Sequence, residues 1–268
     1  IRAGGVVVPI NAMHLTDELA YICENAQIET LLSAQDLVKN IMPLVASGTV
    51  KHVVAAHYAA ALASAHEAGI DIPAMVKAPF VPLPDGVIDW ADMMSADLAL
   101  RPVALSPTDT CAIPYTSGST GRAKGCVHTH QTALHGVDAI AHWFGYTGDE
   151  IHLGVTPMFH IVGLQGIMNV AISTGATIVI MSRWDRQAAA RLIAQRGVTT
   201  WCTVPTAVID LLNTPDLAPQ DLSSLRLVYG GGSAMPEAVA ERLNDMTGLE
   251  FIEVYGMTET MGPISHNA

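Results

Sequence analysis

The sequence predicts an α/β fold built on mainly parallel sheets, and two observations carry that prediction. Short, continuous apolar runs rich in β-branched residues alternate along the chain with longer stretches of helical period. Continuous apolar runs indicate strands that are covered on both faces, as in parallel sheets flanked by helices. Half of the 268 residues are hydrophobic, so the chain is able to bury a large core.

The predicted strands are short, and longer helices separate most of them. Strands are expected at residues 5–9, 30–32, 50–55, 110–115, 151–156, 176–181, 199–204, 225–229 and 250–254. Helices are expected at residues 16–25, 34–44, 130–144, 160–173, 185–195, 205–212 and 236–246. The first helix opens on Thr16-Asp17-Glu18, a pattern typical of a capped start, and Pro236 stands where a first-turn proline is tolerated.

Two segments are predicted to join compact units. Six prolines between residues 73 and 107 predict an extended surface excursion around a short turn or helix at 89–94. The polar and glycine-containing string at 145–149 separates two α/β runs. We therefore expect a first subdomain over residues 1–148, with a phosphate loop near its end, and a second subdomain over residues 149–268.

Charge and cysteine content argue against several classes of protein. The chain has 13 basic and 25 acidic residues, a net charge of −12, which disfavours nucleic-acid binding and a polybasic membrane role. Its four cysteines are scattered without a CxxC pair, as expected of a reduced, cytoplasmic protein. No apolar run approaches the roughly 18 residues of a membrane span, which leaves only peripheral membrane contact open. The chain opens without Met or a signal peptide, and we expect it to be a fragment.

The strongest local signal is the loop at residues 115–125, which follows a predicted strand. It holds three glycines, four hydroxyl side chains at Thr116, Ser117, Ser119 and Thr120, and Lys124. Glycine lets backbone N–H groups turn toward an anion, hydroxyls donate to phosphate oxygens, and lysine supplies a point charge. The spacing does not fit a Walker A loop, because no Ser or Thr follows the lysine. A solvated Gly/Ser turn is the structural alternative.

Two further motifs each follow a predicted strand. The string GGGS at residues 230–233 leads into the helix at 236–246, and its bare backbone would let a flat group lie against it. The string YGMTET at residues 255–260 offers a carboxylate, and carboxylate oxygen is the hard ligand that Mg²⁺ prefers. Taken singly, either string is also compatible with an ordinary turn.

Together these strings resemble the acyl-adenylate-forming superfamily, which includes acyl-CoA synthetases, luciferases and peptide-synthetase adenylation domains. Its signature loop reads approximately (Y/F)-T-S-G-(S/T)-T-G-x-P-K-G, and residues 115–125 match it except at Ala123, where proline is usual. The three motifs also stand in the family's order and approximate separation. Val254 is a second departure, because a glycine usually precedes the tyrosine in related ligases. Residues 126–132, 183–185, 204–206 and 260–267 are similar to the fatty-acid–CoA ligase branch.

The resemblance implies a role for each motif. By similarity, the loop surrounds the phosphates of ATP, the later strings and a histidine line the adenine and acyl pockets, and Glu259 helps to hold Mg²⁺. The residues implied to bind phosphate are Thr116, Ser117, Gly118, Ser119, Thr120, Gly121 and Lys124. Those implied to bind the adenine or the acyl group are His160, Gly230, Gly231, Gly232, Ser233, Tyr255, Gly256, Met257 and Thr258. Lys124, Thr258 and Glu259 are implied to be catalytic.

The resemblance also implies a fold and an activity. The fold would be a truncated N-terminal domain of an acyl-CoA synthetase, with two stacked αβα subdomains. The parent enzyme would join a medium- or long-chain fatty acid to CoA through acyl-AMP, using ATP, Mg²⁺ and CoA. The family's ribose-binding aspartate, its hinge and its C-terminal domain with the adenylation lysine have no counterpart in these 268 residues. We therefore expect this chain alone to bind nucleotide weakly at best and to fail to turn over.

Other readings of the sequence stay open. The acid would be aryl, short-chain or an amino acid if the pocket differs from that of the fatty-acid branch. A phosphotransferase is disfavoured because kinase and Walker motifs are missing. A non-enzymatic nucleotide-binding fragment is the third reading. Cys126, His128 and His130 would share one face of an extended segment, but a structural zinc site needs a fourth ligand that the sequence does not place.

Overall fold

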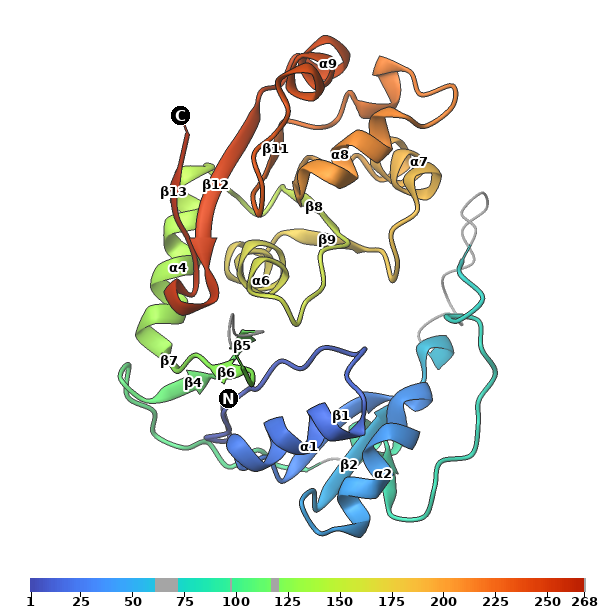
Figure 1. Cartoon of the computed structure of the whole chain (residues 1–268), viewed down its shortest axis with the longest axis vertical. Coiled ribbons are helices and arrows are strands. Elements are labelled where there is room, and N and C mark those ends of the chain that lie inside the picture. Colours follow the sequence, from blue (N-terminus) through green and yellow to red (C-terminus); the bar gives the residue numbers. More distant parts are fainter. Residues whose placement is uncertain (61–71, 97, 117–120, 268) are drawn as a thin grey trace.

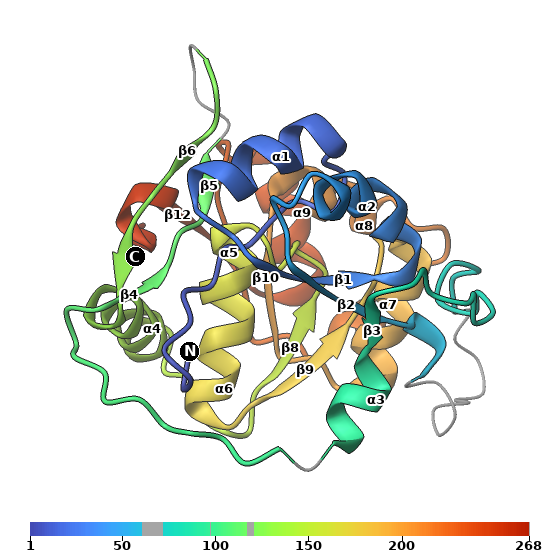
Figure 2. The same ribbon diagram turned by 90° about the horizontal axis from the view of Figure 1, so that it is seen from below.

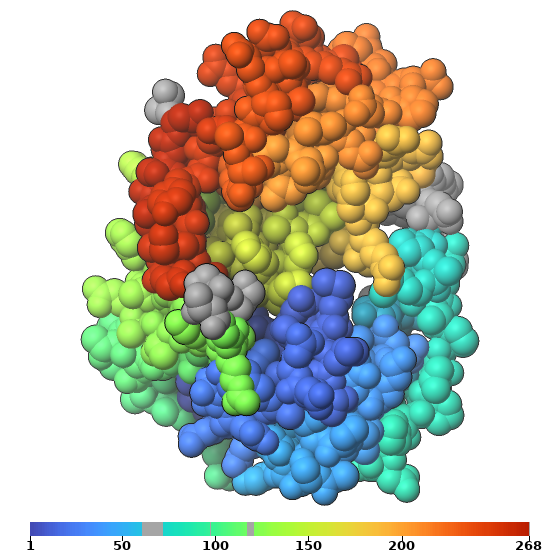
Figure 3. Space-filling view, in the orientation of Figure 1, coloured from blue at the N-terminus to red at the C-terminus, as the bar shows by residue number. Residues whose placement is uncertain are grey.

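The computed structural model describes residues 1–60, 72–96, 98–116 and 121–267. Figure 1 shows most of the first sixty residues at one end of the molecule and the region from about residue 205 to 250 at the other, with the last residues, in red, running back toward the middle. The space-filling view shows the same separation, with residues near 160–170 visible between the two ends (Figure 3). The predicted α/β fold with mainly parallel sheets is confirmed. No helix in the described residues is long and apolar enough to cross a bilayer.

A three-stranded parallel sheet forms the first end of the molecule. It contains β1 (Thr30–Ala34), β2 (His52–Ala56) and β3 (Val87–Asp89) in that order. The helices α1 (Thr16–Asn25) and α2 (Val38–Ala46) lie along it (Figure 2). Leu19, Ile41 and Val53 join these elements in one buried cluster, which fixes both helices against the sheet. A short helix, α3 (Trp90–Ser95), follows β3 and confirms the predicted turn or helix at 89–94.

A six-stranded sheet forms the other end, with the strand order β13-β12-β11-β10-β8-β9. Its strands are β8 (Ile151–Gly154), β9 (Thr177–Ile180), β10 (Thr200–Thr203), β11 (Leu227–Gly230), β12 (Phe251–Met257) and β13 (Gly262–His266). The pairs from β9 across to β12 are parallel, and only β13 runs antiparallel to its neighbour. Each parallel connection carries a helix, as this arrangement requires.

Helices cover both faces of the six-stranded sheet. On one face, α7 (Arg186–Arg196), α8 (Pro205–Leu212) and α9 (Glu237–Thr247) pack around the fully buried Trp201. On the other face, α4 (His130–Trp143) packs with a continuous helical segment over residues 161–174, where Ile140 and Ile167 meet Tyr229. Burial on both faces explains why these strands are continuously apolar in sequence. The helix α4 precedes residue 148 and packs on this sheet. The division at 148 stays a prediction.

Two antiparallel pairs connect the ends. The strand β4 (Thr110–Ala112) pairs with β7 (His128–Thr129), and β5 (Tyr115–Thr116) pairs with β6 (Lys124–Gly125). The predicted strand at 110–115 is therefore two short strands with different partners. The predicted strand at 5–9 was wrong, because this segment makes only an isolated bridge between Val7 and Ala112. The helix predicted at 160–173 is a composite of α5 (Ile161–Gly163), the π-helix η3 (Leu164–Asn169) and α6 (Val170–Thr174).

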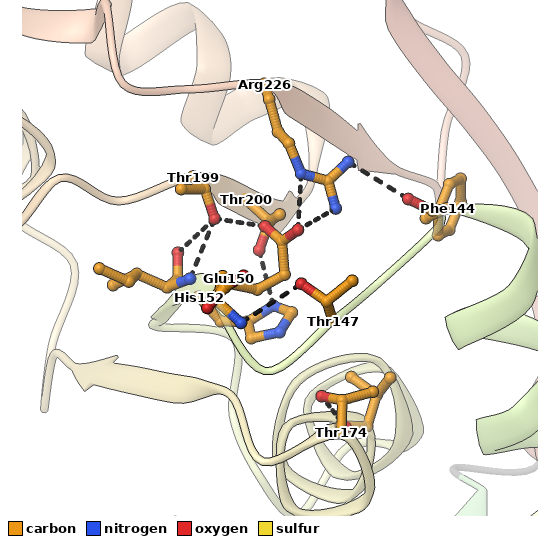
Figure 4. Close-up of polar contacts among 11 residues, drawn as sticks. Phe144, Thr147, Glu150, His152, Thr174, Thr199, Thr200 and Arg226 are labelled. Carbon is orange, nitrogen blue, oxygen red and sulfur yellow. Dashed lines mark hydrogen bonds and ion pairs between the residues drawn. The ribbon is translucent and has the colours of Figure 1, made fainter.

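A polar network joins the amino ends of three central strands (Figure 4). Glu150, Thr199 and Arg226 immediately precede β8, β10 and β11. Arg226 contacts Glu150 Oε1 through Nη2 and through Nε, the latter at 2.7 Å, and Thr199 Oγ1 donates to Glu150 Oε2 at 2.5 Å. Burial of the Glu150 carboxyl would raise its pKa, but the hydrogen bonds from Arg226 and Thr199 hold that pKa below its ordinary value.

His152 lies beside this network and is only 2% exposed. Its Nδ1 is 2.6 Å from Thr200 Oγ1, whereas its Nε2 has no hydrogen-bond partner among the residues described. The ring meets the Tyr146 ring edge-on, with centroids 4.9 Å apart. Burial lowers the pKa of His152 to about 4, so the folded protein keeps this imidazole neutral at pH 7.

We expect His152 to make stability fall as the pH falls from 6.5 toward 4. In this window the unfolded chain protonates at the ordinary pKa of 6.5, whereas the folded chain resists protonation. The difference of pKa corresponds to about 3 kcal/mol of unfolding free energy. Urea unfolding of His152→Asn, which keeps a partner for Thr200, should show a shallower pH dependence across this window than the wild type. Parallel pH profiles for the two proteins would contradict the assignment.

Candidate functional site

A cavity of about 710 Å³ opens at the carboxyl ends of the central parallel strands. Thr156 follows β8, Thr203 ends β10, and Gly230 ends β11, and all three line the cavity. Ligands of parallel α/β sheets bind at this edge because the strand ends and following loops converge there. The cavity has three chemically distinct walls: a polar wall, a glycine wall and an apolar end.

The polar wall combines a cation, hydroxyls and a carboxylate. Thr116 and Lys124 reach the cavity from the β5–β6 hairpin, and Thr258 and Glu259 reach it from η5 (Thr258–Thr260). His128, on β7 just beyond the hairpin, is buried and holds η5, because its Nε2 is 2.8 Å from the Thr258 carbonyl oxygen. Lys124 is the one lysine or arginine that lines the cavity in the described part of the chain. This wall is therefore suited to a phosphate-bearing ligand.

The glycine wall brings bare backbone into close contact. A Cβ atom at Gly230 would lie 1.6 Å from the Thr203 carbonyl oxygen, and one at Gly231 would lie 2.2 Å from the Val254 carbonyl oxygen. A Cβ at Gly256 would lie 2.4 Å from the Gly262 carbonyl oxygen. Only glycine fits at these positions, so the glycine wall presents flat main chain between β10, β11 and β12.

The apolar end lies among β10, β11, α4 and the composite helix. Its lining residues are Ile140, Ile161, Val162, Gly166, Cys202 and Tyr229. Tyr229 is 2% exposed, and its hydroxyl donates to the Gly166 carbonyl oxygen at 3.0 Å. The end therefore presents hydrocarbon and sulfur surface, with its tyrosine hydroxyl already bonded.

His160 stands between the apolar end and the other walls. It is the N-cap of α5, and its Nδ1 accepts a hydrogen bond from the Val162 backbone N–H at 3.2 Å. Desolvation lowers the pKa of His160, which favours the neutral imidazole. Because Nδ1 accepts, the neutral ring carries its hydrogen on Nε2, and this hydrogen is available to a ligand in the cavity.

The structure brings together most of the residues singled out from the sequence. The predicted residues that line the cavity are Thr116, Lys124, His160, Gly230, Gly231, Gly232, Gly256, Met257, Thr258 and Glu259. Ser117, Gly118, Ser119 and Thr120 lie outside the described residues. Gly121, Ser233 and Tyr255 are described but do not line the cavity, and Tyr255 is 59% exposed. The binding roles of all these residues stay predictions.

Several lining residues were not singled out from the sequence. Thr156 stands just beyond a strand end, and the rule that ligands bind at the carboxyl ends of parallel strands would have found it. Ile140 comes from the middle of α4, and no sequence signal distinguishes it from an ordinary core residue. His128 was considered only as a metal ligand, whereas the structure uses its ring nitrogen to hold Thr258. No cluster of three potential metal ligands occurs within the described ranges.

The fold and the cavity define an α/β protein whose ligand site joins a phosphate-type wall to an apolar end. The chain belongs to the family of AMP-binding enzymes, whose family model matches residues 1–268. This confirms the resemblance to adenylate-forming enzymes and the N-terminal-domain fold that it implied.

Relatives carry the names of several different acid–CoA ligases. The chain is 27% identical over 278 residues to long-chain-fatty-acid–CoA ligase of Bacillus subtilis, a match that covers 98% of this chain and 48% of the relative. It is 32% identical over 248 residues to feruloyl-CoA synthase of Amycolatopsis, covering 91% of this chain and 49% of the relative. The chain thus spans about half the length of the curated relatives it matches.

Solved structures show the same fold. The crystal structure of apo MatB from Rhodopseudomonas palustris superposes with a TM-score of 0.80 at 24% identity, covering 99% of this chain and 47% of that chain. An anthranilate CoA ligase in complex with anthranoyl-AMP superposes with a TM-score of 0.83 at 20% identity, covering 100% and 48%. At these identities the likeness establishes the fold.

Proposed function

We propose that this protein activates a medium- or long-chain fatty acid with ATP to acyl-AMP and then transfers the acyl group to CoA. The observation that best supports this proposal is that one cavity combines the polar wall with its lysine, the glycine wall and the apolar end. ATP carries a polyphosphate and a flat base, and a fatty acid carries an apolar tail. The three walls therefore match the three chemical parts of the two substrates.

The residues present fit a Mg²⁺–ATP complex. Glu259 lines the same wall as Lys124, so a carboxylate and a cation face the space proposed for the phosphates. Mg²⁺ is commonly held by one or two carboxylates together with phosphate oxygens, and a single glutamate suits that arrangement. Bound there, Mg²⁺ would neutralise part of the charge of the triphosphate. Thr116 and Thr258 would donate hydrogen bonds to phosphate oxygens from the two sides of the wall.

The proposed chemistry asks the protein for positioning and charge stabilisation. A carboxylate oxygen of the acid forms a bond to the α-phosphorus of ATP as the bond to pyrophosphate breaks. The carboxylate is already ionised, so no general base is required, and Lys124 would stabilise charge on the departing pyrophosphate. In the second half-reaction the CoA thiolate attacks the acyl carbon and AMP leaves with the electrons of the broken C–O bond.

An aryl acid is the second candidate substrate. The relatives named for feruloyl-CoA and coumarate–CoA ligases include proteins at 32 to 34% identity. The apolar end accepts a ring as well as an alkyl chain, because its wall is hydrocarbon. ATP–pyrophosphate exchange by the protein as its gene encodes it, with decanoate, ferulate, benzoate and malonate compared, separates the two. Exchange with ferulate but not decanoate would exclude the fatty acid, and exchange with none of the acids would oppose acid activation.

We expect Lys124→Ala to weaken ATP binding by about 10- to 100-fold, the usual effect of losing a charge-assisted hydrogen bond. Isothermal titration of the ligand-free chain with Mg²⁺–ATP measures this effect. Lys39→Ala is a matched control, because Lys39 lies on α2 and does not line the cavity. Equal ATP affinity of the Lys124 variant and the wild type would remove Lys124 from the proposed site.

A further inference from the structure

The β5–β6 hairpin presents different residues to its two sides. Thr116 and Lys124 line the cavity on one side. On the other side, Arg122 and Ala123 line a separate surface hollow together with residues of α1, including Tyr21. Adjacent residues of an extended strand point in opposite directions, so Tyr115 and Thr116 are placed to serve different sides. Figure 2 shows α1 next to β5 and β6.

Three contacts join the second side of the hairpin to α1. Tyr21 Oη donates to the Ala123 carbonyl oxygen at 2.9 Å, and Tyr115 Oη donates to Asn25 Oδ1 at 2.6 Å. The Arg122 guanidinium lies over the Tyr21 ring, 5.2 Å from its centroid. Both strands of the hairpin are thus attached to the helix, one through Tyr115 and the other through the segment that leads into β6.

The helix is well placed to act as a rigid support. Tyr21 and Asn25 are four residues apart, so they lie on the same face of α1. The opposite face carries Leu19, Ile22 and Cys23, which are at most 8% exposed and anchor the helix in the core. The two side chains that hold the hairpin therefore project from a helix whose own position is fixed by packing.

The hairpin needs such support because it is very small. Its strands contain two residues each, and in the described residues they pair only with each other. An isolated two-stranded hairpin is marginally stable in water at best. Gly125 makes room for the attachment, since a Cβ there would lie 2.7 Å from Ile113 Cγ2 and 3.1 Å from the Tyr115 ring.

We propose that α1 is the platform that positions the phosphate-binding hairpin, with Tyr21 and Asn25 as positioning residues for ATP. This inference rests on the proposed function of the cavity. The helix acts from outside the cavity, and it holds the backbone from which Thr116 and Lys124 extend. Loss of the attachment should therefore weaken contacts to the β- and γ-phosphates and leave binding of the adenosine part unchanged.

Tyr21→Phe tests the platform, because it removes one hydroxyl and keeps the ring under Arg122. We expect faster amide hydrogen exchange in the ligand-free chain at residues 122–126. We also expect the dissociation constant for Mg²⁺–ATP to rise about three- to tenfold, the range for one hydrogen bond, while that for AMP changes less than about twofold. Adding Asn25→Ala should enlarge both effects.

Tyr58→Phe is the matched control, since Tyr58 lies outside α1 and its hydroxyl interacts with Asp36. Unchanged exchange at the hairpin in both α1 variants would overturn the platform. Equal weakening of ATP and AMP would also overturn it, because a general loss of structure affects both ligands. The pyrophosphate exchange described above tests the proposed function separately, and the hydrogen-exchange comparison decides without any nucleotide whether α1 holds the hairpin.

Discussion

Replacing Gly230 with alanine is expected to destabilise the protein by about 4 kcal/mol or more, the range reached by severe steric insertions in a core. The added Cβ would stand 1.6 Å from the Thr203 carbonyl oxygen. Rotating a side chain cannot relieve this overlap, because the obstructing atom belongs to the main chain of the neighbouring strand. The central strands β10 and β11 would have to separate where they are paired and buried.

Urea unfolding measures the effect, as a lower midpoint at an unchanged slope. Gly5→Ala makes the same chemical change at a position where nothing lies within 4 Å of the new Cβ and φ is not positive. It should shift the unfolding free energy by less than about 1 kcal/mol. A Gly230 variant as stable as the Gly5 variant would show that the strands relax freely around this contact.

Replacing Arg226 with methionine is expected to cost about 2 to 3 kcal/mol, because it leaves the buried Glu150 carboxylate without its cation. Glu150 is 6% exposed, whereas the Arg226 side chain is 41% exposed. Water near the outer part of Arg226 would compensate for some of the loss, so we place the cost below that of a fully buried pair. The packing of the guanidinium on the Tyr146 ring would also be lost.

A double-mutant cycle with Glu150→Gln measures the interaction energy between Arg226 and Glu150 apart from the other contacts that Arg226 loses. The double variant should be more stable than Arg226→Met alone, since it contains no buried unpaired charge. Arg226→Met should also regain stability relative to the wild type as the pH falls. Without the arginine, burial raises the pKa of Glu150 above its unfolded value. Protonation of Glu150 as the pH falls therefore stabilises the folded variant, whereas it destabilises the folded wild type. Additive effects of the two substitutions would contradict the pairing.

The sequence predicted those elements whose local signals and burial agree. The first helix was predicted with its observed bounds, Thr16–Asn25, because a polar start and an apolar face mark it. The strands β3, β6, β7 and β13 were missed, because they are short or lie at a sheet edge and carry no continuous apolar run. β12 continues to Met257, beyond the predicted end at 254, because antiparallel pairing with β13 extends it.

In the candidate site, too, the sequence predicted some residues and missed others. Sequence strings pointed to Lys124, the glycine wall and Glu259, and the fold brings them to one cavity. The contribution of α1 left no such pattern, since Tyr21 and Ala123 are 102 residues apart and meet only in three dimensions. The π-helical turn over residues 164–169 was also invisible to a helical hydrophobic period.

The polar network lies at the amino ends of the central strands and the cavity lies at their carboxyl ends. This separation affects which substitutions the protein can accept. The strands β8, β10 and β11 contain four residues each, so their two ends are roughly 13 Å apart. Substitutions farther apart than about 10 Å usually have additive effects. If the proposed function holds, changes around the apolar end would therefore alter the choice of acid without loss of the stability supplied by Glu150 and Arg226. Substitutions that change the acid specificity would then accumulate while the Glu150–Arg226 network stays unchanged.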